Sequence, residues 1–285
     1  MYLARIISKL RKELNSIGFD LSGELSVVKA RGDTYFFRIE KEDISHIVRY
    51  CESGNARDLI KDWLVLAEYG IETGILQYSD YVIVYKDYAL SGFHKSVKID
   101  DFFDENFVRN IAKWYRKIHS IGDERIRNRK DYFTSENILG LIKEYNLETN
   151  EFLNYVLKNY DNIKLKLNRY KLCLNVGKLD VGNLFSSRDD SYSFAVAMDE
   201  MCLGFKFEDI GLILEMIDEE FKDIFMEEYG EIAEEDILLS KVVGTIINLC
   251  VGIKCKKLPE DIDRYIDLIN RQELLESARV LVEWY

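Results

Sequence analysis

The chain has 285 residues, of which 47% are hydrophobic and 13% aromatic, and it carries a formal net charge of −12. That apolar content is enough to build a sizeable core, which excludes a disordered chain. The acidic balance argues against a broad contact with a nucleic-acid backbone, which needs a basic surface. A single proline, Pro259, leaves no proline-rich linker. We therefore expect one large domain or two closely packed ones.

The five cysteines include no C-x-x-C pair, and the chain has three histidines. A disulfide framework or a structural zinc site is therefore not expected, and the thiols are interpreted as free and buried. Residues 1–18 spread their charges at helical spacing, without the apolar segment typical of a secretory signal. The longest apolar stretch, residues 242–253, is too short to cross a bilayer. These features predict a cytoplasmic protein with no membrane span.

The N-terminal part of the chain predicts a helix followed by a hairpin. Residues 1–17 place apolar side chains at spacings of three and four, the pattern of an amphipathic helix. Residues 24–30 and 34–40 are rich in β-branched and aromatic side chains, and an Arg-Gly-Asp turn separates them. This pattern is typical of two antiparallel strands joined by a tight turn.

The remaining elements predict an α+β protein in which strands and helices are segregated. Residues 42–70 have a helical period with a break near Gly54, so we expect two helices there. Residues 74–88 predict two more strands. Most of the later chain is helical in period, apart from a β segment around residues 172–198. This order does not alternate strand with helix, which disfavours a Rossmann sheet.

The β segment in the helical part contains the residues that suggest chemistry. A glycine-containing loop ends at Asn183, and the apolar run after the next polar turn ends at Asp199. A two-stranded ribbon would bring these two side chains together. An amide oxygen and a carboxylate are hard ligands suited to Mg²⁺, and kinase-type phosphoryl transfer holds its metal with such a pair. The competing interpretation is two ordinary polar residues at strand ends.

Several segments in order resemble the aminoglycoside phosphotransferase and choline kinase-like proteins, a kinase-like superfamily. V-G-K-L-D-V-G-N at 176–183 is similar to the catalytic loop H-G-D-x-x-x-x-N, and A-M-D-E at 197–200 to the metal-site segment. Residues 81–92 look like the last strand and hinge of the N-lobe. Residues 108–122 resemble the helix before the catalytic loop, and F-E-D-I-G at 207–211 resembles the segment that opens the next helix.

The resemblance implies a two-lobed protein-kinase-like fold of the α+β class. Its N-lobe would span residues 1–86, with a helix and an antiparallel sheet on the nucleotide side. Its mainly helical C-lobe would span residues 87–285 and carry the catalytic-loop ribbon near residues 172–200. The implied cofactors are ATP or GTP with Mg²⁺, the metal being held by Asn183 and Asp199.

The catalytic loop departs from the family pattern at its most important position. Lys178 stands where the family has its catalytic aspartate, and Val176 stands where it has the preceding histidine. A lysine ammonium cannot accept the proton of an acceptor hydroxyl, although it can still bind a γ-phosphate. Asp180, two residues further on, is the one nearby carboxylate that can substitute as the base. The alternative for Asp180 is a solvated loop carboxylate.

The N-lobe departs as well. Arg38 falls near the strand lysine that holds the α- and β-phosphates in the family, and Lys29 on the neighbouring strand is an alternative. The acid that should pair with this cation is not identifiable, with Asp58 and Asp62 as candidates by position. No G-x-G-x-x-G precedes these strands, so few backbone N–H groups are available for phosphates.

Two aromatic residues of the hinge segment, Tyr85 and Tyr88, are candidates to stack on a nucleobase, although core packing is the commoner role of such side chains. Together with Arg38 and Lys29 they form the predicted nucleotide-binding set.

Three functions follow from these residues. The first is a divergent kinase-fold protein that binds ATP with Mg²⁺ but has impaired or absent phosphotransfer, as in a pseudokinase. The second is an active small-molecule kinase that phosphorylates a hydroxyl of a cationic substrate with Asp180 as the base. The third is a helical interaction scaffold that binds no nucleotide. Eleven acidic residues between Glu215 and Asp236 suggest a cationic small molecule or protein partner, or simply a solvated helix face.

Overall fold

A computed structural model of the chain describes residues 2–20, 22–42, 44–90, 93–128, 132–177, 181–196, 201–230, 232–254 and 259–283. The chain forms two compact units. The first comprises Met1–Asp101 with Asp180–Met198, and the second comprises Phe102–Leu179 with Asp199–Tyr285.

The α-helices are α1 (Tyr2–Ser16), α2 (Ala56–Glu68), α3 (Glu105–Ile118), α4 (Ser135–Glu144), α5 (Glu151–Lys158), α6 (Tyr160–Leu167), α7 (Lys206–Met216), α8 (Glu219–Tyr229), α9 (Glu234–Leu239), α10 (Thr245–Lys254), α11 (Pro259–Ile269) and α12 (Gln272–Glu283). The strands are β1 (Glu24–Arg31), β2 (Thr34–Lys41), β3 (Ile44–Cys51), β4 (Ile75–Tyr78), β5 (Val82–Lys86), β6 (His94–Ser96), β7 (Cys173–Asn175), β8 (Leu184–Ser187), β9 (Ser193–Ala195) and β10 (Cys202–Gly204).

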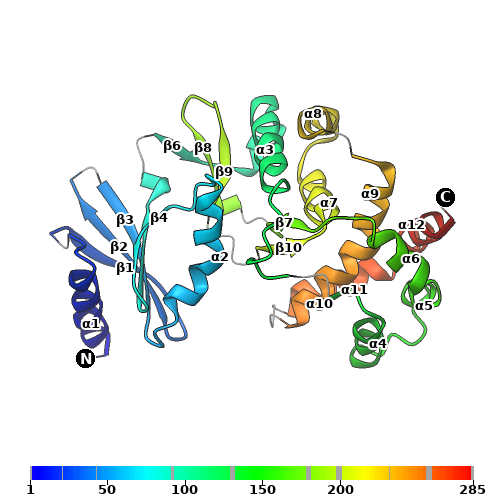
Figure 1. The fold of residues 1–285 in the computed structure, drawn as a ribbon, viewed down its shortest axis with the longest axis horizontal. Coiled ribbons are helices and arrows are strands. Elements are labelled where there is room, and N and C mark those ends of the chain that lie inside the picture. Colours follow the sequence, from blue (N-terminus) through cyan, green and yellow to red (C-terminus); the bar gives the residue numbers. More distant parts are fainter. Residues whose placement is uncertain are drawn as a thin grey trace. The chain divides into compact units, whose positions relative to one another are not determined.

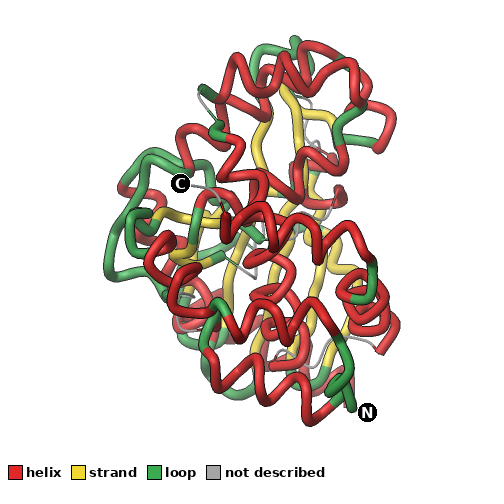
Figure 2. The backbone as a smooth tube through the Cα atoms, turned by 90° about the vertical axis from the view of Figure 1, so that its right-hand side faces the viewer, coloured by secondary structure: helices red, strands yellow, loops and turns green. Residues whose placement is uncertain are grey.

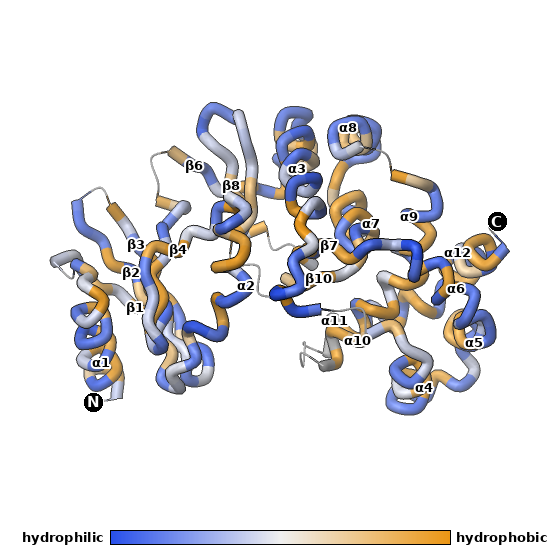
Figure 3. Tube along the Cα trace, in the orientation of Figure 1, coloured by the Kyte–Doolittle hydropathy of each residue, from blue (hydrophilic) through white to orange (hydrophobic). Residues whose placement is uncertain are grey.

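The first unit is built on a five-stranded antiparallel sheet in the order β1-β2-β3-β5-β4 (Figure 1). Helix α1 covers one face, where Ile6, Leu10 and Leu14 pack with apolar side chains of β2, β3 and β5. Hydrophilic and hydrophobic residues alternate along α1 in Figure 3, as its amphipathic spacing predicts. Helix α2 packs against β3 and β5 on the other side of the sheet (Figure 1).

One predicted element is wrong. Residues 44–51, expected to be helical, form strand β3 in the middle of the sheet, and only α2 follows the break near Gly54. Apolar residues such as Ile44, Ile47 and Val48 fit a helical spacing of three and four. Pairing on both sides, with β2 and with β5, decides in favour of the strand. The hairpin and the strands within residues 74–88 are confirmed.

A second, three-stranded sheet in the first unit has the order β6-β8-β9. Its β8–β9 hairpin confirms the ribbon expected around residues 172–198. Because β6 pairs with β8, this hairpin belongs to the same compact unit as the large sheet. The boundary predicted at residue 86 concerns the lobes of the resembled family and remains a prediction.

The second unit is mainly helical, and among its described residues the strands are the β7–β10 pair (helices red and strands yellow in Figure 2). Its core gathers apolar side chains from α4, α5, α6, α7 and α9 to α12. Four cysteines in the described part of the chain are free and buried, as expected: Cys51, Cys173, Cys202 and Cys250. A β-sheet region followed by a helical region confirms the α+β class.

Candidate functional site

The sheet face covered in part by α2 carries most of the predicted nucleotide-binding residues. Side chains alternate between the two faces of a strand, and α1 occupies the face of Phe37 and Val48. The opposite face therefore holds two rows of paired residues. One row is Lys29, Phe36, Arg49 and Ile83, and the other is Ser26, Arg38, Ile47 and Tyr85. The structure thus brings Lys29, Arg38 and Tyr85 to one face.

In the first row, Phe36 lies under two cations. The Lys29 ammonium is 4.7 Å from the Phe36 ring centroid, and the Arg49 guanidinium carbon is 5.4 Å from it. Both distances fall within the range of cation–π attraction. Within the described part of the chain, Lys29 forms no ion pair, so its charge is available to an anion.

Arg49 is a cation that the sequence reading missed. The sequence predicts a helix at this position, whereas Arg49 lies two residues before the end of the central strand β3 and is half-buried. Helix α2, which packs against β3, contributes Asp62 with 3% of its surface exposed. Asp58, the other candidate acid on this helix, is exposed. The carboxylate that faces the sheet is therefore Asp62.

Arg38 is held by an acid that the sequence did not suggest. Its Nε donates to Oδ2 of Asp87 over 2.8 Å, and Ser45 Oγ donates to the same oxygen over 2.8 Å. The Asp87 side chain is only 4% exposed, whereas that of Arg38 is 31% exposed. Since buried charges need partners, this pair fixes the direction of the guanidinium.

Tyr88, also predicted to stack on a nucleobase, is buried among side chains of the first unit. Its ring contacts His94, Phe185 and Phe194, and its hydroxyl donates to Glu72. Burial and the Glu72 carboxylate raise the pKa of Tyr88 well above its usual value. Tyr88 thus packs the hinge segment against the β8–β9 ribbon, which is the alternative role foreseen for it.

The β1–β2 turn leaves no open loop for phosphates. Arg31 pairs directly with Thr34, so only Gly32 and Asp33 form the turn, and Gly32 has a φ of 62°. The turn is tied down, because Glu52 N donates to Asp33 O over 3.0 Å. A hydrogen bond from Ser53 lowers the pKa of Asp33. This hairpin is therefore a two-residue turn that carries an exposed carboxylate.

The ribbon of the small sheet positions Asn183 at its entrance. Asn183 ends a short 3-10 turn, Val181–Asn183, and the backbone N–H of Val196 donates to its carbonyl over 2.9 Å. The chain thus leaves the second ribbon strand beside Asn183. Asp199, the predicted partner for Mg²⁺, lies outside the described residues, as do Lys178 and Asp180.

In the second unit, a buried carboxylate anchors the start of the predicted catalytic loop. The backbone N–H groups of Val176 and Gly177 donate to Asp209 over 2.7 and 2.8 Å. Asp209 is fully buried, and His119 Nε2 lies 3.1 Å from its Oδ2. These contacts join β7, α3 and α7 at the residues where the sequence resembled the family.

His119 also contacts a residue that the motif comparison did not assign to this site. Its Nδ1 lies 2.8 Å from the hydroxyl of Tyr229, at the end of α8. We assign the ring proton to Nε2, which donates to Asp209, while Nδ1 accepts from Tyr229. Burial raises the pKa of Tyr229, which keeps this hydroxyl protonated as a donor.

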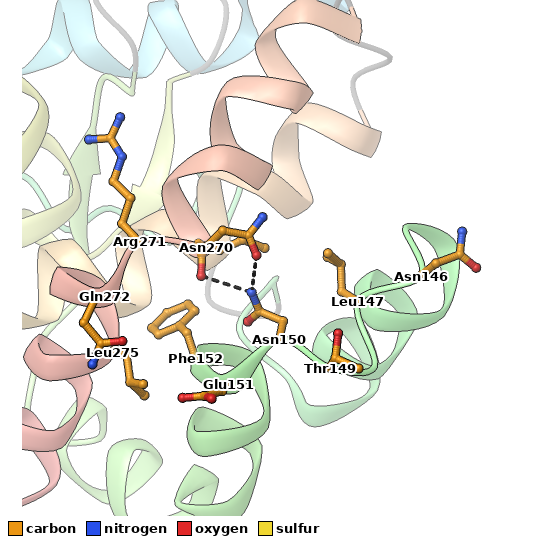
Figure 4. A pocket seen from close by; sticks show the side chains of 11 residues that line it. Asn146, Leu147, Thr149, Asn150, Glu151, Phe152, Asn270, Arg271, Gln272 and Leu275 are labelled. Atoms are coloured by element: carbon orange, nitrogen blue, oxygen red, sulfur yellow. Dashed lines mark hydrogen bonds between the residues drawn. The ribbon is translucent and has the colours of Figure 1, made fainter.

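A pocket of about 320 Å³ lies elsewhere in the second unit, where α5 and α12 begin (Figure 4). Asn150 caps α5 through Leu153 N and also donates to Ile269 O and Asn270 Oδ1. Its amide therefore joins two segments of the helical core, and none of the predicted site residues lines the pocket. In the described part of the chain, no helix has the length and apolar character needed to cross a membrane.

Comparisons with known proteins place the fold. No protein-family model matches the chain, and a search of curated proteins finds no match. Solved structures do match. Choline kinase LicA from Streptococcus pneumoniae superposes with a TM-score of 0.68 at 15% identity, covering 98% of this chain and 99% of that chain.

Two phosphotransferase structures give similar values. APH(2")-IIia, in complex with GDP and kanamycin, has a TM-score of 0.63 at 13% identity, covering 95% of this chain and 98% of its own. Spectinomycin phosphotransferase APH(9)-Ia, in complex with ADP and spectinomycin, has a TM-score of 0.59 at 13% identity, covering 98% of both chains. The chain therefore has the kinase-like fold of these small-molecule phosphotransferase structures, at low sequence identity to each of them.

Proposed function

We propose that this protein binds a nucleoside polyphosphate on the α2 side of the first-unit sheet, with impaired or absent phosphotransfer. The observation that carries the proposal is the row Lys29–Phe36–Arg49, two cations over one ring on an antiparallel sheet. Similar folds have been solved with ADP and with GDP, which supports a nucleotide as the ligand.

In this proposal Arg49 and Lys29 bind the phosphates. Arg49 lies on the strand that precedes α2, and that helix supplies the buried Asp62, an arrangement suited to holding a cation in place. Arginine keeps its charge at all relevant pH values and binds phosphate oxygens through two parallel N–H groups. Side-chain charges would then take the role of a longer phosphate-binding loop, since the β1–β2 turn has only two residues.

The impaired chemistry rests on Lys178 at the position of the family's catalytic aspartate. An ammonium cannot accept the acceptor's proton, and loss of a general base costs about 10²- to 10⁴-fold in rate. Asn183 and Asp199 would hold Mg²⁺, since an amide and a carboxylate oxygen are ligands that this ion prefers. The position of Asn183 at the ribbon entrance supports this assignment.

The second candidate is an active small-molecule kinase that uses Asp180 as its base. The anchored loop favours it, because Asp209 holds the backbone of Val176 and Gly177 directly before Lys178. Its acceptor would be a cationic molecule drawn to the acids of α8. Glu228 of that helix is paired with Arg109 and Lys113, and Glu227, whose Oε2 lies 4.0 Å from Arg109, is largely exposed.

Thermal unfolding with ATP or GTP, each with and without Mg²⁺, tests binding. Saturable binding raises the unfolding temperature by mass action, and at 100 times Kd it adds about 2.7 kcal/mol. No shift at millimolar nucleotide overturns both kinase functions and leaves the interaction scaffold.

Turnover then separates the two kinase functions. We expect no nucleotide hydrolysis or transfer by the wild type, and a gain of activity in Lys178→Asp. Activity in the wild type that disappears in Asp180→Asn would instead assign Asp180 as the base. Lys61→Met, which removes an exposed cation from α2, is the matched control for charge.

A further inference from the structure

The Arg38 guanidinium is held in one orientation, but only one of its nitrogens donates a hydrogen bond in the described part of the chain. Its Nε donates to Asp87, and no hydrogen bond from either terminal nitrogen reaches a residue in the described part of the chain. Asp87 is nearly inaccessible, and Ser45 donates to the same carboxylate oxygen, so the acid is fixed from two directions. A side chain that is 31% exposed thus presents two parallel N–H groups in a defined direction.

The position of Arg38 along its strand separates it from the end of the sheet where Lys29 and Arg49 are proposed to bind the phosphates. Arg38 lies four residues from Thr34, where the tight turn ends, which is about 13 Å at the rise of an extended strand. Its row contains Ile47 and Tyr85, and its partner Asp87 directly follows strand β5. This is the hinge end of the sheet, where the resembled fold receives the nucleobase.

We propose that Arg38 recognises the base and makes the site selective for guanine over adenine. Guanine presents two neighbouring acceptors, O6 and N7, which match the two free nitrogens of an arginine. Adenine has an amino donor in place of O6, which opposes the guanidinium. Asp87 acts as a positioning residue because it fixes Arg38 without needing to touch the base. The inference rests on the proposed nucleotide binding.

Calorimetric titration of the full chain with GDP, ADP and inosine diphosphate tests this inference. A bidentate arginine contact discriminates by about 1–3 kcal/mol, so GDP should bind about tenfold more tightly than ADP. Inosine diphosphate keeps O6 and N7 but lacks the 2-amino group. It should therefore bind like GDP, and binding like ADP would overturn the contact with O6 and N7.

Single substitutions distinguish contacts with the nucleobase from contacts with the phosphates. Arg38→Met should abolish the GDP preference by weakening GDP alone, and Asp87→Asn should reduce that preference while Arg38 is still present. Lys41→Met is the matched control, since Lys41 is on the same strand but pairs with Asp20 at its exposed end. Thermal unfolding of each variant without nucleotide reports whether the sheet remains folded.

Each result has a distinct meaning. Binding of GDP and ADP with equal affinity, or preference for ADP, overturns the guanine selectivity and leaves nucleotide binding intact. An equal loss of both nucleotides in a folded Arg38→Met variant assigns Arg38 to the phosphates and also overturns it. Absence of binding by every diphosphate overturns the proposed function itself.

Discussion

Two regions whose sequence resembles kinase-like catalytic segments differ in how the structure builds them. The entrance of the predicted catalytic loop has a buried anchor, in which Asp209 accepts the N–H groups of Val176 and Gly177. The β1–β2 turn, by contrast, is reduced to two residues and carries Asp33. A buried carboxylate thus fixes the backbone before the predicted loop, whereas the β1–β2 turn is short and carries an exposed acid.

The largest expected effect tests the buried anchor. Asp209→Ala leaves two buried backbone donors and the His119 imidazole without their acceptor, and each such group costs about 1–3 kcal/mol. We expect the free energy of unfolding to fall by about 3 kcal/mol or more in urea titrations. Asp223→Ala, which removes an exposed carboxylate of α8, should change it by less than about 0.5 kcal/mol. Equal stability of the two variants would show that Asp209 is no anchor.

The next effect tests whether Arg49 belongs to the proposed phosphate-binding site. Arg49→Met removes a cation from the α2 face while it keeps an apolar stem on strand β3. Hydrogen bonds to charged groups contribute about 1.5–3 kcal/mol, so nucleotide affinity should fall about tenfold or more. Calorimetry of this variant and of Lys61→Met measures the difference, and unchanged affinity in Arg49→Met would remove Arg49 from the site.

A smaller effect concerns the link between the anchor and α8. Tyr229→Phe removes the hydroxyl that donates to His119 but keeps the ring, which stacks on Phe225 at 5.8 Å between centroids. Loss of one hydrogen bond predicts about 1 kcal/mol of destabilisation in urea unfolding. A variant as stable as the wild type would mean that His119 is oriented without Tyr229.

The smallest effect is a pH dependence in the first unit. Burial is the main cause that lowers the pKa values of His46 and His94, so the unfolded chain binds protons there before the folded chain does. Stability should therefore decline as the pH falls below about 6.5, the ordinary histidine value. Unfolding titrations between pH 7 and pH 5 should show a flatter decline in the variant that combines His46→Gln and His94→Gln. An identical slope in both proteins would contradict these shifts.

The sequence predicted the fold class, the first hairpin and the ribbon at Asn183, because alternating β-branched and aromatic residues are a local signal. It failed at residues 44–51, where the apolar spacing also suits a helix and long-range pairing with β2 and β5 decides. That error concealed Arg49, the cation on the central strand. The Arg38–Asp87 pair joins residues 49 positions apart, so no local pattern reveals it. The segment around Asp209 is visible in the sequence as a motif, but its contacts with Val176 and Gly177, and the contact between His119 and Tyr229, required the structure.

The most direct test of nucleotide binding without phosphotransfer measures nucleotide affinity and nucleotide turnover in the same protein. Calorimetric titration with GTP or ATP in the presence of Mg²⁺ should give saturable binding to the wild type. The same preparation should release no phosphate above the rate without protein, and Lys178→Asp should gain turnover. Absence of binding by either nucleotide, or rapid turnover by the wild type, would contradict this account.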